Sequence, residues 1–262
     1  MGKERADILI TSLGLAPSRE KAKAMIMAGE VFSGTKKITK PGEMLPEDAE
    51  LTVKGNSCPY VSRGGLKLEK AMKVFDVSLN GKICADIGAS TGGFTDCMLK
   101  NGAVKVYAVD VGYGQLDWSL RNDDRVVVME RTNARFLTKE SFDDQVEFAS
   151  VDVSFISLKL IFPALKAAGI AETVTLIKPQ FEAGKENVGK NGVVRDPKVR
   201  KQVIHDVIQY AYENGYCIKA LDFSPIKGPS GNIEFIAYFT LSSEENTIDV
   251  KKAVDASTEF FA

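Results

Sequence analysis

Strand-like runs alternate with helical stretches from residue 83 on, and this alternation limits the possible folds most. The runs are KICADIG, VKVYAVDV, RVVVMER, VEFASVDV and TVTLIKP. Such alternation is typical of a parallel sheet covered by helices on both faces. Two later runs, GYCIKALDFSPI and NIEFIAYFTL, are joined only by KGPSGN, which leaves no room for a crossover helix. They are expected to pair as an antiparallel hairpin at the sheet edge. The sequence therefore predicts an α/β fold.

The N-terminal segment differs in charge from the rest of the chain. Residues 1–40 contain eight Lys or Arg and four acidic residues, a local balance of +4, whereas the whole chain has 34 basic and 35 acidic residues. Two short helices with basic residues on an exposed side would suit a phosphate backbone, although a solvated helical face would give the same pattern. The candidate RNA-binding residues are Arg5, Arg19, Lys21, Lys23, Lys36, Lys37 and Arg63.

The domain boundaries follow from composition. We expect a small α+β domain over residues 1–54 and a linker, GNSCPYV, over 55–61, because Gly, Asn, Ser and Pro disfavour either periodicity. The α/β domain should cover 62–245, and the tail 246–262 is polar and then weakly helical. The N-terminus lacks a signal pattern, and no apolar run approaches a bilayer span. A cytoplasmic protein without stable membrane association is expected.

The segment ICADIGASTGGFTD, residues 83–96, places a glycine-rich turn between a strand and a helix. In open α/β sheets, ligands bind beside such a turn. A dinucleotide fingerprint fails, because Ser90 stands where its second glycine belongs. Asp110 lies 22 positions after Gly88, where an acidic residue binds the ribose of an adenosine-bearing ligand. The turn therefore favours an adenosine cofactor without a pyrophosphate.

A serine hydrolase is the competing interpretation of the same turn. Gly88 to Gly92 fit the pattern GxSxG, and Ser90, Asp152 and His205 occur in the chain order that α/β-hydrolases use. His205 is the only histidine, however, and it falls inside a strong helical pattern, whereas a catalytic histidine normally lies on a loop. The four cysteines form no CxxC pair and no zinc spacing, so no metal site is expected.

Four charged residues attract notice beyond the turn: Lys67, Asp152, Lys178 and Glu234. Three of them stand at ends of predicted strands that this topology directs to one rim of the sheet. Taken singly, each would be an ordinary surface charge. Taken together, a lysine and an acid that end neighbouring apolar strands indicate a site.

The chain resembles the TlyA family through long, specific blocks. They are SRGG-K-L, DIGASTGGFTD, AVDVGYGQLDWSLRND, ERTNAR, DVSFISL, KPQFE and GPSGN-E. Members are ribosomal RNA 2′-O-methyltransferases, long labelled hemolysin A, with an FtsJ-like catalytic domain behind a small alpha-L RNA-binding domain. The resemblance implies a Rossmann-like methyltransferase sheet, S-adenosylmethionine as cofactor, and a cytidine ribose of small-subunit rRNA, in some members also of large-subunit rRNA, as substrate.

The resemblance also implies roles for particular residues. The catalytic tetrad maps onto Lys67, Asp152, Lys178 and Glu234. The implied cofactor contacts are Asp86, Gly88, Ala89, Ser90, Thr91, Gly92, Gly93, Phe94, Thr95, Asp110, Val111, Gly112, Asn133 and Asp152. Lys178 is expected either to remove the proton of the ribose 2′-hydroxyl or to remain a cation that stabilises the alkoxide. A membrane-active hemolysin and a non-catalytic RNA-binding protein stay as alternative functions.

Overall fold

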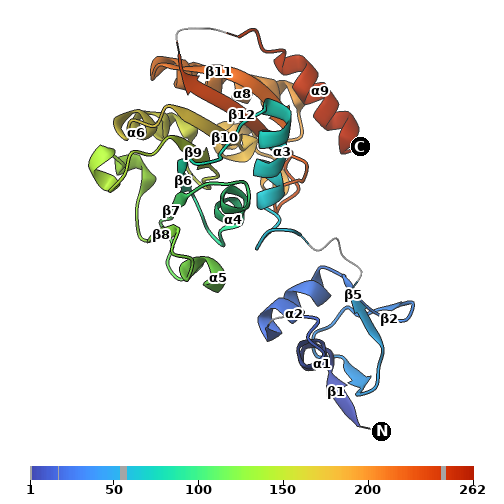
Figure 1. Ribbon diagram of the computed structural model, residues 1–262. Helices are drawn as coiled ribbons and strands as arrows, with labels where there is room; N and C mark the ends of the chain where they lie inside the picture. Colours follow the sequence, from blue (N-terminus) through green and yellow to red (C-terminus); the bar gives the residue numbers. More distant parts are fainter. Residues whose placement is uncertain (1, 17, 54–57, 243–245) are drawn as a thin grey trace. The chain divides into compact units, whose positions relative to one another are not determined.

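The computed structural model describes residues 2–16, 18–53, 58–242 and 246–262 (Figure 1). The chain divides into two compact units, Met1–Pro59 and Tyr60–Ala262. Residues 55–57 of the predicted linker 55–61 lie outside the described residues. Each unit has a core of its own and is described by itself.

The smaller unit packs two short helices with short strands. Helix α1 (Ala6–Ser12) contacts α2 (Arg19–Met27), and the buried side chains between them include Leu9, Ile10 and Ile26. Ser18 caps α2 by accepting a hydrogen bond from the N–H of Lys21. The strands are β1 (Lys3–Arg5), β2 (Val31–Ser33), β3 (Lys36–Lys37), β4 (Met44–Pro46) and β5 (Leu51–Val53). Strand β1 pairs with β4, and β2 lies between β3 and β5.

The larger unit contains a seven-stranded sheet within the described residues, in the spatial order β11-β12-β10-β9-β6-β7-β8. Its strands are β6 (Ile83–Ile87), β7 (Lys105–Val109), β8 (Val126–Met129), β9 (Phe148–Val151), β10 (Glu172–Ile177), β11 (Tyr216–Phe223) and β12 (Phe235–Leu241). Strands β6 to β10 are parallel, and β12 is antiparallel to both of its neighbours. The predicted α/β class and the terminal hairpin are confirmed. Strand β11 is the edge strand, and β12 lies between β11 and β10.

Helices cover both faces of this sheet (Figure 1). They are α3 (Gly65–Phe75), α4 (Gly93–Lys100), α5 (Trp118–Arg121), α6 (Phe162–Ala167), α7 (Pro179–Glu182), α8 (Pro197–Glu213) and α9 (Val250–Phe260). Short 3-10 turns are η1 (Ala134–Phe136), η2 (Lys139–Ser141), η3 (Leu158–Leu160), η4 (Lys185–Asn187) and η5 (Lys190–Gly192). Helix α9 lies in the predicted tail and packs against α8 and β11.

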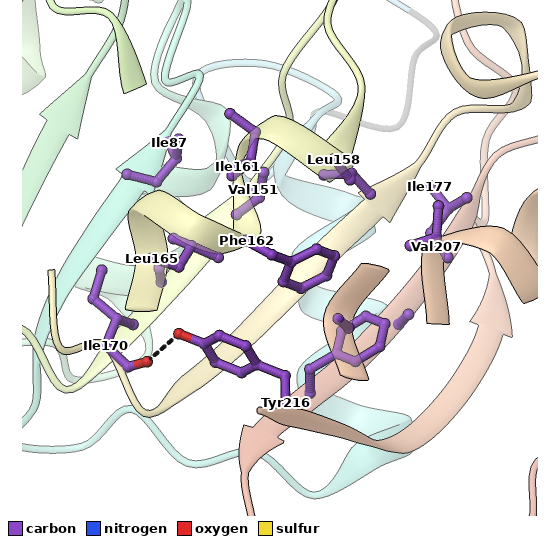
Figure 2. Close-up of a cluster of buried hydrophobic side chains, with 14 of the residues drawn as sticks. Ile87, Val151, Leu158, Ile161, Phe162, Leu165, Ile170, Ile177, Val207 and Tyr216 are labelled. Carbon is purple, nitrogen blue, oxygen red and sulfur yellow. Dashed lines mark hydrogen bonds between the residues drawn. The ribbon is translucent and has the colours of Figure 1, made fainter. Parts of the chain in front are cut away.

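The main core lies where α6 and α8 meet one face of the sheet (Figure 2). Because side chains alternate along a strand, Ile87 and Val151 point to this face, while their neighbours Asp86 and Ser150 point to the other. Phe162 packs 5.7 Å from Tyr216 between ring centroids. The hydroxyl of Tyr216 donates to the carbonyl of Ile170 at 2.6 Å, so this buried polar group is satisfied (Figure 2).

The register of the strands brings polar residues together at the carboxyl ends of the central parallel strands. Ile177 pairs with Phe235, so Lys178 leaves β10 next to the point where Glu234 enters the antiparallel β12. Ile87 pairs with Val151 in the same way, which places Gly88 beside Asp152. Glu234 therefore precedes its strand, rather than beginning it, and meets residues that follow theirs.

Candidate active site

The four charged side chains predicted as a tetrad converge at the carboxyl ends of these parallel strands. The ammonium of Lys67, on α3, lies 2.7 Å from Oε2 of Glu234 and 3.9 Å from Oδ2 of Asp152. The ammonium of Lys178 lies 2.5 Å from Oδ1 of Asp152. Lys67, Lys178 and Glu234 are buried, and the Asp152 side chain is 19% exposed. Two cations thus share one partly exposed carboxylate at the centre of the cluster.

Two further polar residues complete this cluster, and sequence reasoning missed both. The ammonium of Lys178 donates to Oγ of Ser154 at 3.0 Å and also lies 3.5 Å from the carbonyl of Asp152. The amide of Gln180 donates to Oε1 of Glu234 at 3.2 Å. Both residues follow a tetrad member by two positions, in DVS and KPQ, which is the only signal that the sequence offers.

The tetrad lines a cavity of about 520 Å³, within the size range of ligand sites. Besides the tetrad, its wall includes most of the glycine turn and residues Ser62, Phe155 and Phe181. The charged groups therefore face a space that a substrate could enter, rather than the packed core.

The glycine turn approaches the end of β9 more closely than a side chain would allow. Gly88 has φ +90°, and a Cβ atom there would lie 2.7 Å from the carbonyl oxygen of Asp152. The N–H groups of Gly88 and Ala89 both donate to the carbonyl of Val109. Ser90 has φ +48°, a left-handed conformation that is uncommon for a residue with a side chain. The turn is therefore held by backbone contacts on both sides.

Asp110 ties the glycine turn to the loop after β7. Its Oδ2 accepts from the N–H of Ser90 at 2.8 Å, and its Oδ1 accepts from the N–H of Gly112 at 2.7 Å. Asp110 also lines a second cavity of about 710 Å³, whose wall includes Asn133 and the apolar Ile156. A carboxylate beside an apolar wall suits the ribose and the base of an adenosine.

The two cavities meet at the turn and at the loop after β9. Their shared residues are Gly88, Ser90, Asp152, Ser154 and Phe155. The adenosine-sized cavity thus adjoins the tetrad cavity at Asp152. A ligand that occupied both would have its middle next to the charged cluster.

The predicted cofactor residues separate into two groups in the structure. Those that line one or both cavities are Gly88, Ala89, Ser90, Thr91, Gly93, Phe94, Asp110, Val111, Asn133 and Asp152. Asp86, Gly92, Thr95 and Gly112 line neither. A contact of these four with the cofactor stays a prediction.

Asp86 illustrates why a motif residue can lie outside the site. Its side chain points to the face of β6 that α4 covers, where it accepts from the N–H and hydroxyl of Thr95 at 2.8 and 2.7 Å. The hydroxyl of Ser150 donates to its other oxygen at 3.0 Å. Burial raises the pKa of Asp86 to about 6, although these hydrogen bonds act in the opposite direction. Asp86 thus anchors the start of α4.

The raised pKa of Asp86 predicts a dependence of stability on pH. Between the ordinary value of 3.8 and about 6, the folded protein binds this proton more tightly than the unfolded chain, so the contribution of Asp86 to stability falls as pH rises. We expect the free energy of unfolding of Asp86→Asn, minus that of the wild type, to increase by about 2 kcal/mol between about pH 4 and pH 7. Urea unfolding at several pH values measures this difference. Asp124→Asn, at an exposed position, is the control, and an equal change in both variants would contradict the assignment.

Phe155 is a second feature that the sequence did not reveal. It is 90% exposed, has φ +62° and lines both cavities. Its ring packs 5.0 Å from that of Phe181 between centroids. An exposed aromatic ring in a strained conformation at the mouth of a cavity is available to stack on a planar ligand.

The candidate RNA-binding residues of the smaller unit lie at its surface. Lys21, Lys36 and Lys37 are exposed, Lys23 is half-buried, and Lys36 forms an ion pair with Glu43 at 2.7 Å. Arg5 and Arg19 both bind the carboxylate of Asp7, with side chains 42% and 51% exposed. Arg63 is exposed and belongs to the larger unit, directly before α3.

The serine hydrolase interpretation fails on geometry. His205 lies exposed on α8 and lines neither cavity, while Ser90 donates its N–H to Asp110. Ser90 and His205 therefore do not share a site.

Comparison with known proteins identifies the family. A family model described as FtsJ-like methyltransferase matches residues 60–241, and an S4 domain model matches 4–51. The "16S/23S rRNA (cytidine-2'-O)-methyltransferase TlyA" of Mycobacterium tuberculosis is 44% identical over 92% of this chain and 91% of that protein. The chain belongs to the TlyA family of FtsJ-like methyltransferases. It is therefore an enzyme of the methyltransferase class, and the predicted Rossmann-like fold with a small N-terminal domain is confirmed.

Other relatives agree with this assignment. The "Putative rRNA methyltransferase YqxC" of Bacillus subtilis is 57% identical over 90% of this chain and 85% of that protein. A solved structure called "Putative hemolysin from Streptococcus thermophilus" is 48% identical, with a TM-score of 0.80, and the match covers 100% of this chain and 98% of that one. Within the described residues of this TlyA-family chain, no helix is long and apolar enough to cross a membrane.

Proposed function

We propose that this TlyA-family enzyme transfers a methyl group from S-adenosylmethionine to the 2′-hydroxyl of a cytidine ribose in ribosomal RNA. The observation that carries the proposal is the convergence of two lysines and two carboxylates in a cavity that opens onto the glycine turn. The substrate named for the M. tuberculosis relative, a cytidine of 16S and 23S rRNA, is the substrate that we propose here.

The lining of the larger cavity fits the cofactor. Asp110 would bind the ribose hydroxyls, Asn133 and Ile156 would flank the adenine, and the backbone of the turn from Gly88 would accommodate the amino-acid end. Gly88 lets this turn pack directly against Asp152, since a Cβ atom there would lie 2.7 Å from the carbonyl oxygen of Asp152. S-adenosylmethionine, when bound, supplies a methyl group on a positively charged sulfur.

The tetrad would act on the substrate hydroxyl. The ammonium of Lys178 lies within 3.5 Å of Oδ1 of Asp152, the carbonyl oxygen of Asp152 and Oγ of Ser154. Each of these oxygen atoms can accept a hydrogen bond, an arrangement that suits a protonated lysine. Lys178 would therefore hold the 2′-oxygen and stabilise its negative charge as the hydroxyl proton passes to solvent. If Lys178 is instead the base, it must first lose a proton itself. Glu234 and Asp152 would fix both ammonium groups in place, since precise positioning is what an in-line displacement requires.

Ribosomal RNA is proposed as the partner on two grounds. The S4 domain match covers the basic N-terminal segment, and phosphate contacts from Lys and Arg position a protein on RNA. If the target nucleotide lies in a folded helix, it must leave the stack to reach the tetrad cavity, and Phe155 is placed to stack on its base. The hydroxyl itself restricts the enzyme to RNA, since DNA has none.

The test of the proposed function is methylation of a defined nucleotide. Purified enzyme, labelled S-adenosylmethionine and ribosomal subunits should give label at one cytidine ribose in each rRNA, located by nuclease mapping. With a 2′-deoxy residue at that nucleotide, the label should fall to background, because the accepting oxygen is missing. RNA binding to the deoxy substrate, measured in parallel, is the control. Undiminished label on the deoxy substrate would show that the base is the acceptor and would overturn the proposal.

A further inference from the structure

A buried carboxylate in the smaller unit binds two of the candidate RNA-binding arginines. Asp7 lies in the first turn of α1, and its side chain is 0% exposed. Its Oδ1 accepts from Nε of Arg5 at 2.9 Å, and its Oδ2 accepts from Nη2 of Arg5 at 3.2 Å and from Nη2 of Arg19 at 3.1 Å. One carboxylate therefore joins strand β1, helix α1 and helix α2.

Asp7 is ionised at neutral pH. The hydrogen bond from Arg5 is the main reason that the pKa of Asp7 is lowered to about 2, and Arg19 acts in the same direction. Burying a carboxylate is costly unless it is paired and hydrogen-bonded, and here two guanidinium groups satisfy it. The three side chains together carry a net charge of +1.

The hydrogen bonds to Asp7 involve only some of the N–H donors of the two arginines. A guanidinium has five N–H donors, and the hydrogen bonds to Asp7 occupy two of those of Arg5 and one of those of Arg19. Both side chains remain about half exposed. Gly42 packs closely against Arg5, because a Cβ atom at position 42 would lie 3.2 Å from Nη1 of Arg5.

We propose that Asp7 is a positioning residue that holds Arg5 and Arg19 together as a single site for one backbone phosphate of RNA. Both arginines donate to the same oxygen, Oδ2, so their guanidinium groups lie close to each other. Two such cations would repel each other and occupy many rotamers without the carboxylate between them. When Asp7 holds them in place, they offer a phosphate two planar donor groups. Binding then loses less side-chain conformational entropy, because the guanidinium groups are already ordered. This inference rests on the proposed RNA-binding function of the smaller unit.

Charge makes the inference testable, because the two explanations of Asp7 predict opposite signs. If Asp7 is only a structural ion pair, removing its negative charge makes the unit more basic and should tighten RNA binding. If Asp7 positions the arginines, the same substitution should weaken binding in spite of the added positive charge.

The experiment measures the affinity of the full-length protein for an rRNA fragment by fluorescence anisotropy at two salt concentrations. Asp7→Asn should raise the dissociation constant roughly tenfold, the loss of one well-aligned charged contact. The matched control is Glu20→Gln, which removes one negative charge at an exposed position next to Arg19 and should leave affinity unchanged or tighter. Unchanged or tighter binding by Asp7→Asn would overturn the inference.

A second variant removes the ambiguity of a folding defect. Arg5→Lys combined with Arg19→Lys keeps the charge and loses the planar donors, so it should weaken RNA binding, and adding Asp7→Asn to it should weaken binding little further. Full additivity of the two changes would refute the positioning role. If the lysine variant binds RNA as the wild type does, this pair is no RNA contact and the inference fails. Methylation of the same rRNA by the wild type, assayed alongside, tests the proposed function separately.

Discussion

Replacing Lys178 with alanine is expected to reduce the rate of methyl transfer about a thousandfold, while the affinity for S-adenosylmethionine stays close to that of the wild type. Its ammonium lies 2.5 Å from Asp152 and 3.0 Å from Ser154 in the tetrad cavity, where the substrate oxygen would be activated. Without it, the carboxylate of Asp152 would face the reacting oxygen with one cation fewer. Single-turnover transfer of labelled methyl groups measures the rate, and calorimetry measures cofactor binding.

Lys82→Ala is the matched control for this prediction. Lys82 also forms an ion pair, 2.9 Å from Glu172, but it precedes β6 and so lies at the opposite edge of the sheet. It should retain the rate of the wild type. Lys178→Arg then distinguishes the two roles, since arginine keeps the positive charge but does not lose its proton in a protein. Measurable activity in Lys178→Arg supports charge stabilisation, and none supports a base. Near-normal turnover by Lys178→Ala would refute the assignment of Lys178.

Replacing Gly88 with alanine is expected to weaken S-adenosylmethionine binding about a hundredfold, which corresponds to about 2.7 kcal/mol. The new Cβ would lie 2.7 Å from the carbonyl oxygen and 2.9 Å from the carbonyl carbon of Asp152. These are backbone atoms held in the sheet edge, so the turn must move instead. Since Asp152 belongs to the tetrad, methyl transfer should fall together with cofactor affinity. Equilibrium binding of the cofactor and single-turnover assays measure both effects.

Gly81→Ala separates the clash from backbone strain. Gly81 has φ +77°, close to the +90° of Gly88, but a Cβ atom there has nothing within 4 Å. Alanine costs of order 1 kcal/mol of strain in such a conformation, so this variant should lose some thermal stability and keep its cofactor affinity. Equal loss of affinity in the two variants would show that the close approach of Gly88 to Asp152 is not what matters.

Site residues at the ends of strands could be predicted from the sequence. The runs ending before Asp110, Asp152 and Lys178 could be recognised from their composition, and short connections imposed the antiparallel hairpin that brings Glu234 to the same edge. Local pattern suffices there, because a parallel sheet places the ends of all its strands together. Lys67 is different, since it lies on α3, and its contact with Glu234 depends on how that helix packs.

Two aspartates near the glycine turn differ in their surroundings, which only the structure shows. Asp86 and Asp110 both end or follow a strand near the glycine turn, yet Asp86 is buried under α4, whereas Asp110 lines the larger cavity. Ser154, Gln180 and Phe155 entered the site only through contacts with residues far away in the chain. No periodicity within a single segment carries that information.

Hydrophobic periodicity, connection lengths and motif blocks are local properties, so the amino-acid sequence alone predicted the α/β class, the end of the sheet where the chemistry lies and the family to which the chain belongs. The packed fold was needed to show which carboxylates face a cavity, which ones anchor a helix, and which arginines share a partner. Those outcomes depend on the face of a strand that a packed helix covers and on hydrogen bonds across many residues, as in the pairing of Lys67 with Glu234 and of Arg19 with Asp7.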